Sequence, residues 1–343
     1  MKKKSIQAMR LCSLAAMMCG AGQMAYAHTG IKDKVFLEGM GNTGLSSATA
    51  FSSTVYNAFT ITHGCLTNDV AEGTPAVHLN VIGQAAVFPN STNSSDVRIF
   101  RYAAGSISGK TLVGTPVASP IGSAGGAIAS PNDLSDDIQG AVAGQAFNNF
   151  GLGLVSPNLF GNVIIPKIDG TGITRGYAVY NGPTKYDSQV APLEEDVIST
   201  TGLSTFKHTI PKFKSTSCAK SLVVRVAVGN WCLKGPKSDK NPDRMDAWVG
   251  SYTDSAIFNM TANPLIMPNS QATIDASPGT DFWPSFTVLR DTTNNPFQGA
   301  CADPANQYDV VIEPKGTDID KYLNIPKGKY PTGATGPAFW PQP

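Results

Sequence analysis

Residues Ser221–Cys232 read SLVVRVAVGNWC, an apolar run that contains four valines and ends in a cysteine. Branched apolar side chains in an unbroken run between turn signals are typical of a buried β-strand. A charged loop follows, and then a shorter segment, DRMDAWVG, that carries Asp246 and Trp248. The stretch therefore predicts one strand that ends at Cys232 and a second, short strand after the loop.

Similar runs recur along the chain, and several of them alternate apolar and polar side chains as a half-buried antiparallel strand does. The chain has 34 glycines, 24 prolines and only 15% charged residues, and no helical period extends beyond a few turns. This pattern predicts an all-β protein, with an antiparallel β-sandwich as the economical architecture. The other strand-like runs are Ser53–Thr62, Ala76–Gly83, Asp96–Ala103, Gly161–Ile168, Gly176–Gly182 and Tyr308–Pro314.

Two segments depart from the strand pattern. Residues from about 104 to 160 are rich in glycine, alanine, serine and proline, which predicts a long loop insertion between strands. Residues 251–343 are repeatedly broken by proline and hold Trp283 and Trp340, which predicts an irregular C-terminal extension packed on the sandwich. The sandwich domain itself is expected to span residues 28–250.

The first 27 residues have the three parts of a secretory signal peptide. A basic head, Met1–Lys4, precedes an apolar body, Leu11–Gly22, that is too short to span a bilayer. Ala25 and Ala27 then give the small-x-small spacing of a cleavage site. Cleavage after Ala27 would make His28 the first residue of a periplasmic or secreted protein.

Cleavage before a lipidated Cys19 is the competing interpretation, which the bulky Met18 disfavours. Removal of the leader leaves 22 basic side chains against 25 acidic ones. This balance argues against nucleic acid or an anionic membrane as a partner. After the leader, no segment of the sequence is long and apolar enough for a transmembrane helix.

Four cysteines remain after cleavage: Cys65, Cys218, Cys232 and Cys301. An even number in an oxidising compartment predicts two disulfides, for which three connectivities are possible. Because the spacing gives no CxxC pair, a zinc or iron–sulfur site built on these cysteines is disfavoured.

A histidine at the first position of the mature chain offers a metal ion two nitrogen donors. The α-amine and the imidazole Nδ1 of His28 can close a six-membered chelate ring, and an α-amine has a reference pKa of about 8. Nitrogen donors in a tetragonal arrangement suit Cu(II), which also heads the affinity order of divalent metals. The chain holds only 4 histidines, so the position of His28 predicts a metal site, with chance as the alternative.

Two other segments could complete such a site. FTITHGC, residues 59–65, reads as a strand end that brings His63 near Cys65, although a glycine turn with a hydrogen-bonding His63 is the simpler alternative. Trp248 is at a position where tryptophan is usually a core residue. Over a bound copper ion, however, its indole could exclude water and stabilise the cuprous state by cation–π attraction.

These segments resemble the YcnI-like periplasmic copper-binding family. FTITHGC followed by TPAVHLNVIG is similar to the family's early hairpin, and LVVRVAVGNWC with DRMDAWVG is similar to its closing hairpin. Members of the family also begin with histidine after signal cleavage, as this chain is expected to do at His28. The resemblance covers residues 28–90 and 161–250 in outline.

The resemblance implies an immunoglobulin-like sandwich that holds one Cu(II) through the amine and imidazole of His28. A carboxylate would lie nearby and Trp248 close above the ion. The resemblance also implies a disulfide between Cys65 and Cys232, which leaves Cys218 for Cys301.

The chain departs from the family at two points. HTGIKDKVFLEG, residues 28–39, contains turn-forming residues where the family has a regular strand. The carboxylate ligand is also open: Asp246 and Glu38 are candidates, whereas GLSTFKHTIP offers His208 where an acidic residue is expected.

The leading functional prediction is an exported copper-binding protein, and not an enzyme, that acts in copper scavenging, storage or delivery. The family implies a membrane copper importer or another periplasmic copper carrier as its partner. A second possibility is a secreted structural β-protein without metal. A third is an oxidative copper monooxygenase acting on polysaccharide, in which His63 or His208 supplies a second imidazole. The sequence lacks G-x-S-x-G, HExxH and phosphate-loop motifs.

Overall fold

The computed structural model describes part of the chain. The described residues are 29–39, 53–61, 65–66, 78–79, 81–105, 107–108, 111–112, 116–117, 120–128, 133–141, 163–180, 203–232, 244–249, 267–268 and 284–323.

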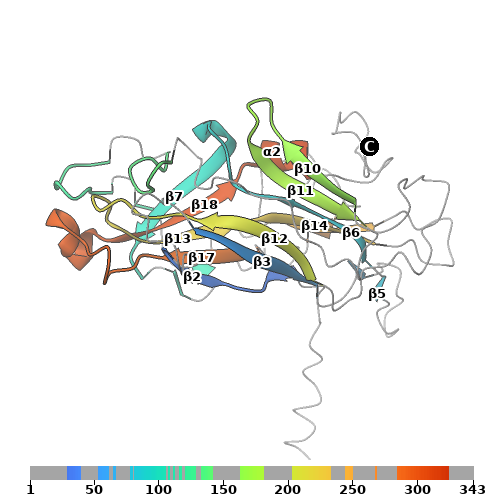
Figure 1. The fold of residues 1–343 in the computed structure, drawn as a ribbon, viewed down its shortest axis with the longest axis horizontal. Coiled ribbons are helices and arrows are strands. Elements are labelled where there is room, and N and C mark those ends of the chain that lie inside the picture. Colours follow the sequence, from blue (N-terminus) through green and yellow to red (C-terminus); the bar gives the residue numbers. More distant parts are fainter. Residues whose placement is uncertain are drawn as a thin grey trace, which may run out of the picture.

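The apolar run at residues 221–232 forms two strands instead of the single strand that the sequence predicts. β13 (Ala219–Arg225) belongs to a five-stranded sheet, and β14 (Ala227–Cys232) belongs to a six-stranded sheet. Val226 lies between them, where its N–H donates to the carbonyl of Pro284. The run is therefore the element that links the two larger sheets, which lie along the long axis of the molecule (Figure 1).

The five-stranded sheet has the order β2-β17-β13-β18-β7. Its members around β13 are β2 (Val35–Leu37), β17 (Ser285–Leu289), β18 (Tyr308–Pro314) and β7 (Val97–Ala103). The β13–β18 and β2–β17 ladders are parallel, and the other ladders of this sheet are antiparallel.

The six-stranded sheet has the order β10-β11-β6-β14-β15-β16. Around β14 it comprises β10 (Val163–Ile168), β11 (Thr174–Tyr180), β6 (Val81–Val87), β15 (Arg244–Trp248) and β16 (Met267–Pro268). Only the β15–β16 ladder in it is parallel. The all-β prediction is thus confirmed, whereas three ladders, β13–β18, β2–β17 and β15–β16, depart from its antiparallel detail.

A three-stranded antiparallel sheet, β1-β3-β12, completes the main architecture. It consists of β1 (Thr29–Ile31), β3 (Ser53–Ile61) and β12 (Leu203–Ile210). The remaining elements are β4 (Cys65–Leu66), β5 (His78–Leu79), β8 (Ile107–Ser108), β9 (Thr111–Leu112), the 3-10 turns η1 (Ser94–Asp96), η3 (Gly299–Ala302) and η4 (Pro304–Asn306), and the helix α2 (Gly316–Tyr322).

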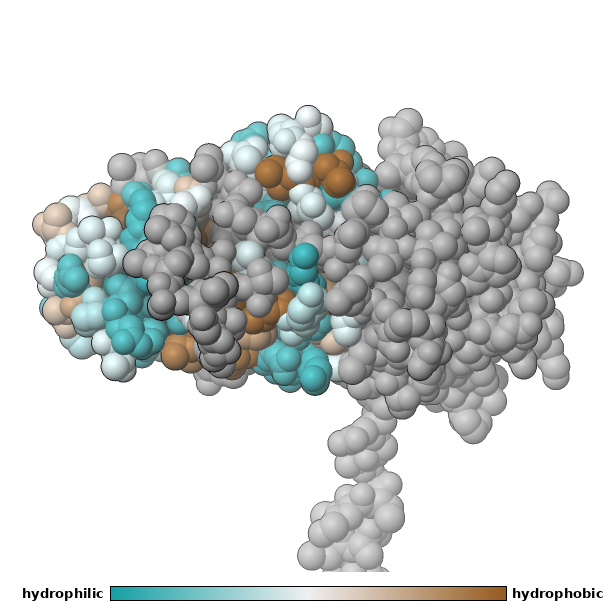
Figure 2. Space-filling model, viewed as in Figure 1, coloured by the Kyte–Doolittle hydropathy of each residue, from teal (hydrophilic) through white to brown (hydrophobic). Residues whose placement is uncertain are grey.

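The three sheets share one hydrophobic core. Phe59 of β3 stacks on Phe206 of β12 with ring centroids 4.7 Å apart, and Phe206 packs on Phe88, which follows β6, at 5.2 Å. In the five-stranded sheet, Phe36 meets Phe286 edge to face at 5.7 Å. Burial of such rings gives about 1.5–3 kcal/mol each and holds the sheets together. On the face seen in Figure 2, the described surface mixes hydrophilic and hydrophobic side chains.

The segment predicted as a loop insertion contributes to the core. Leu134 and Ile138 are fully buried. Between them in sequence, the buried carboxylate of Asp137 accepts hydrogen bonds from Arg101 at 2.8 Å and from the Tyr308 hydroxyl at 2.6 Å. Because a buried charge is tolerated only when it is paired and hydrogen-bonded, these contacts fasten the insertion to β7 and β18.

The C-terminal part differs from the predicted irregular extension over its described length. β18 lies between β13 and β7 inside the five-stranded sheet, and β17 pairs with the other side of β13. A disulfide joins Cys218, just before β13, to Cys301 in η3, which confirms that pairing. The sequence pattern predicted the strand at Tyr308–Pro314, whereas it did not predict β17 or the place of either strand in the sheet. Among the described residues, no helix has the length and apolar character needed to span a bilayer.

The close approach of β11 to β6 gives a test of this fold. A Cβ on Gly176 would lie 1.9 Å from the carbonyl oxygen of Ala86. We expect Gly176→Ala to lower the free energy of unfolding by about 3 kcal/mol, the upper end of overpacking costs, as measured by urea denaturation. Gly170→Ala is the matched control, since its Cβ would meet no atom within 4 Å. Equal losses in the two variants would contradict the β6–β11 register.

Candidate functional site

The mature amino terminus is expected just before β1, so the surroundings of β1 define the candidate site. Thr29, the first residue of β1, pairs with Ile61, the last residue of β3. His28 and His63 both lie outside the described residues. In the sequence, His28 directly precedes Thr29, and His63 follows Ile61 by two residues.

Ring contacts align this sheet with the two larger sheets. His208 of β12 pairs with Val55 of β3, and its ring lies 4.5 Å from that of Phe286, the β17 partner of Val224. Four residues further along β3, Phe59 has its ring 6.4 Å from that of Tyr177.

The same spacing appears on the opposite side of the core. Tyr177 pairs with Ala86, and Ala86 pairs with Val228, which lies four residues beyond Val224. Ile61 lies two residues beyond Phe59 on β3, and Asn230 lies two residues beyond Val228 on β14.

A row of polar residues crosses the six-stranded sheet at that position. Gln84, Asn230 and Asp246 are register partners on the adjacent strands β6, β14 and β15. Gln84 and Asn230 are 0% and 2% exposed, and the Gln84 amide donates to Asn230 Oδ1 at 2.8 Å. Within the described part of the chain, Gln84 Oε1 is buried without a hydrogen-bond partner. A buried polar row is costly unless it meets further polar groups.

Two residues proposed from the sequence lie on β15 beside this row. Asp246 occupies the register position next to Asn230, although its side chain lies outside the described residues. Trp248, two residues further on and therefore on the same face of the strand, is 3% exposed and belongs to the core. The tryptophan thus packs one step from the polar row, beside Val228.

His208 is not at this end of the sheet. Its partner Val55 precedes Ile61 by six residues, which is about 20 Å along a strand. Its ring is fully buried among Phe36, Phe206 and Phe286, and Nδ1 lies 2.9 Å from the carbonyl oxygen of Thr209. Desolvation lowers the pKa of His208 to about 4, so the imidazole is neutral at physiological pH.

Glu38, the other carboxylate considered, is occupied by the protein itself. Oε2 accepts from the Phe213 N–H at 2.7 Å, Oε1 accepts from the Asp291 N–H at 2.8 Å, and the Asn295 amide donates to both oxygens. Burial raises the pKa of Glu38 above its usual value, against the lowering effect of these hydrogen bonds and of Arg290. Glu38 therefore links the end of β2 to two loops, and both of its carboxylate oxygens are engaged in these hydrogen bonds.

The two remaining cysteines are placed only by their backbones. Cys65 is in β4, which pairs with β5 and lies against β14 and β15. Cys232 is the last residue of β14. The proximity of β4 to β14 agrees with a Cys65–Cys232 disulfide, which stays a prediction because both side chains lie outside the description.

Among the described residues, no group of three or more histidines, cysteines and acids could hold a metal ion. Sequence reasoning also missed Gln84 and Asn230, which stand in otherwise apolar strands. The sequence signal for both residues was a polar side chain at an inward position of a strand. This signal can be recognised only when the pairing of the two strands is known.

Comparison with known proteins adds no relative: no family model, no curated protein and no solved structure matches this chain. The likeness to the copper-binding family therefore stands on the short motifs alone.

The buried His208 gives a pH-dependent test. The pKa of His208 in the folded protein, about 4, lies below the ordinary histidine value of 6.5, so the unfolded chain binds more protons between these limits. Stability is then fully present above about pH 6.5 and falls by roughly 3 kcal/mol as the pH drops through 4. We expect His208→Phe to flatten this slope in denaturant titrations at several pH values.

Lys207→Gln serves as the control, because Lys207 lies on the opposite face of β12. It should retain the slope of the parent protein. If the slope in His208→Phe equals that of the parent, another group causes the acid sensitivity.

Proposed function

We propose that the exported chain binds one Cu(II) ion at its mature amino terminus and acts in copper scavenging, storage or delivery. The amine and imidazole of His28 would chelate the ion, His63 would supply a second imidazole, and Asp246 would supply the carboxylate. Trp248 would shield the site. A binding role, rather than catalysis, and an immunoglobulin-like arrangement of the sheets belong to the same proposal.

The pairing of the start of β1 with the end of β3, and the row of Gln84, Asn230 and Asp246 in the six-stranded sheet, support this proposal, in which the two lie opposite each other. Facing sheets are about 10 Å apart. Ligands that reach inward from both sides can therefore meet at one ion. Nitrogen and carboxylate donors are a set that Cu(II) accepts.

The donor set also accounts for an unusual feature of the core. Gln84 Oε1 is a buried acceptor without a partner in the described part of the chain. Ligating imidazoles commonly donate their second N–H to an amide or carboxylate oxygen, which fixes the orientation of the ring. An imidazole at the end of β1 or β3 would provide such a donor, and Gln84 would then position a ligand without touching the metal.

Within this site each protein group has a separate task. The His28 amine must lose its proton to bind, so copper affinity should rise with pH up to the pKa of the amine. Trp248, which is almost fully buried, would exclude water from one side and favour the reduced ion through its ring face. A bound copper ion can exchange one electron between its cupric and cuprous forms, and a membrane copper importer or a periplasmic carrier would be the natural partner.

The proposal predicts one tight equivalent of Cu(II) for residues 28–343 with a free amine, measured by titration calorimetry and electron paramagnetic resonance. One extra residue before His28 should lower the affinity more than about 100-fold, beyond the effect of an outer-shell change. His63→Ala should also weaken binding and change the nitrogen hyperfine pattern, whereas Gln84→Leu should cost about 10-fold.

His78→Ala is the matched control, since His78 lies on β5 and is assigned no ligand role. It should bind copper as the parent protein does. Equal affinity with and without the extra residue would refute the site and favour the structural β-protein. Mass spectrometry of the exported chain tests the required start at His28, and oxygen-dependent turnover of a polysaccharide would identify the monooxygenase instead.

A further inference from the structure

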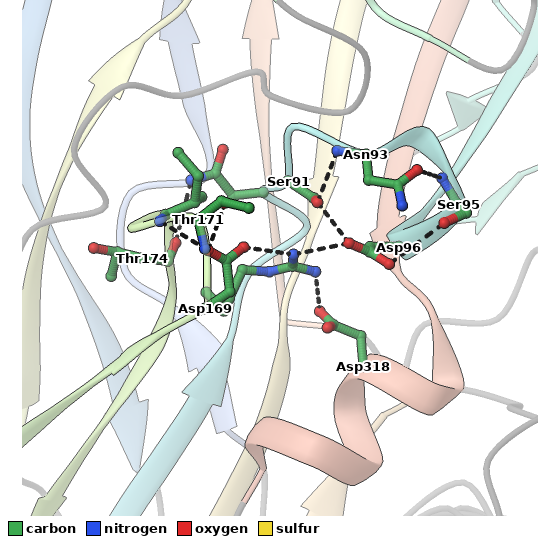
Figure 3. Close-up of polar contacts among 11 residues, drawn as sticks. Ser91, Asn93, Ser95, Asp96, Asp169, Thr171, Thr174 and Asp318 are labelled. Carbon is green, nitrogen blue, oxygen red and sulfur yellow. Dashed lines mark hydrogen bonds and ion pairs between the residues drawn. The ribbon is translucent and has the colours of Figure 1, made fainter.

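A single buried arginine on β11 of the six-stranded sheet contacts carboxylates from three separate segments of the chain. The Arg175 side chain, on β11, is 1% exposed. Its Nη1 lies 3.2 Å from Asp96 of η1 and 3.3 Å from Asp169 of the β10–β11 turn, and its Nη2 contacts Asp318 of α2 (Figure 3). The helix α2 is thereby joined to two loops through one guanidinium.

The three carboxylates are not equally supported. Asp169 accepts hydrogen bonds from the N–H groups of Thr171 and Ile173. Asp96 accepts from the Ser91 hydroxyl at 2.7 Å. The Asp318 carboxylate, 7% exposed, has Arg175 as its hydrogen-bond donor among the residues described.

The charges around Asp318 do not balance. Arg175 contributes one positive charge against the carboxylates of Asp96, Asp169 and Asp318. On α2 itself, the exposed Lys321 amine lies over the Tyr322 ring, and that ring also lies 5.5 Å from the Arg175 guanidinium.

The environment makes ionisation of Asp318 unfavourable. Desolvation is the main cause that raises the pKa of Asp318 to about 6, and the charge of Asp96 adds to it, while Arg175 and Lys321 oppose it. Asp169, in contrast, has a lowered pKa, because its hydrogen bonds outweigh its desolvation. The ionised carboxylate of Asp318 is therefore less stable in this cluster than that of Asp169.

We propose that α2 is a pH-dependent latch, which is docked when Asp318 is protonated and opens locally when Asp318 ionises beside Asp96 and Asp169. Ile319 and Leu323, both fully buried, supply an apolar contact that does not depend on pH. The ionisation state of the carboxylate cluster then sets the equilibrium constant for breaking that contact.

Linkage gives the size of the effect. The pKa of Asp318 is about 6 with α2 docked, against the ordinary aspartate value of 3.8 when the side chain is in water. The equilibrium constant for local opening should therefore rise about tenfold between pH 5 and pH 7. The sign is fixed because the docked state binds more protons in this range.

Hydrogen exchange at the helix tests the proposal. The N–H groups of Ile319 and Leu323 donate within the helix at 2.9 and 2.8 Å, so their exchange reports opening of α2. After correction for intrinsic rates, we expect their protection to fall about tenfold from pH 5 to pH 7. Asp318→Asn should remove this pH dependence, whereas Asp33→Asn, a change at an exposed site before β2, should preserve it.

A second measurement needs no variant. The Asp318 carboxyl carbon, followed by NMR in the full chain, should titrate with a midpoint near 6. Constant protection of α2 across this range, an unchanged slope in Asp318→Asn, or a carboxyl midpoint near that of a free aspartate would each overturn the latch.

Discussion

The structure depends on the continuous burial of the chain from Ser221 to Asn230. In this segment, which covers most of β13 and β14, every residue is buried, so neither strand can be an edge. A buried strand must find hydrogen-bond partners on both sides, because unpaired peptide groups are costly away from water. β13 finds β17 and β18, and β14 finds β6 and β15. At Val226 the chain passes from one sheet to the other, so the same run supplies a central strand to each. The two sheets share a core with β1, β3 and β12.

Buried charged side chains hold the loops in place, as packed aromatic rings hold the sheets together. Asp137 fastens the segment after residue 133 to Arg101 and Tyr308, and Glu38 fastens β2 to the chain at Phe213 and Asp291. Each charged group is expensive to bury and is stable only in its complete set of partners. Such groups select one arrangement of long connections that carry little apolar surface of their own.

The two functional features lie on the same sheet and follow the same physical rule. The row at Gln84 and Asn230 is polar where the core is apolar, and the cluster at Arg175 has more carboxylates than cations. In each proposal an added species supplies the missing interaction: a metal ion with its ligands at the row, and a proton at the Arg175 cluster. β6 connects them, since it carries Gln84 and packs against α2.

The sequence by itself indicated several strands, such as Tyr308–Pro314, because alternation with period two is a local property that YDVVIEP displays without its neighbours, although it did not indicate β12 or β17. It also predicted the all-β class, and the disulfide confirms the predicted pairing of Cys218 with Cys301. The tertiary structure alone decided that the run at 221–232 divides between two sheets and that the C-terminal strands lie inside one of them. It also separated His208 from the end of the sheet where β1 begins, and brought Gln84, Asn230 and Asp246 into one row. These facts depend on register between strands far apart in the chain, and no local pattern encodes register across such distances.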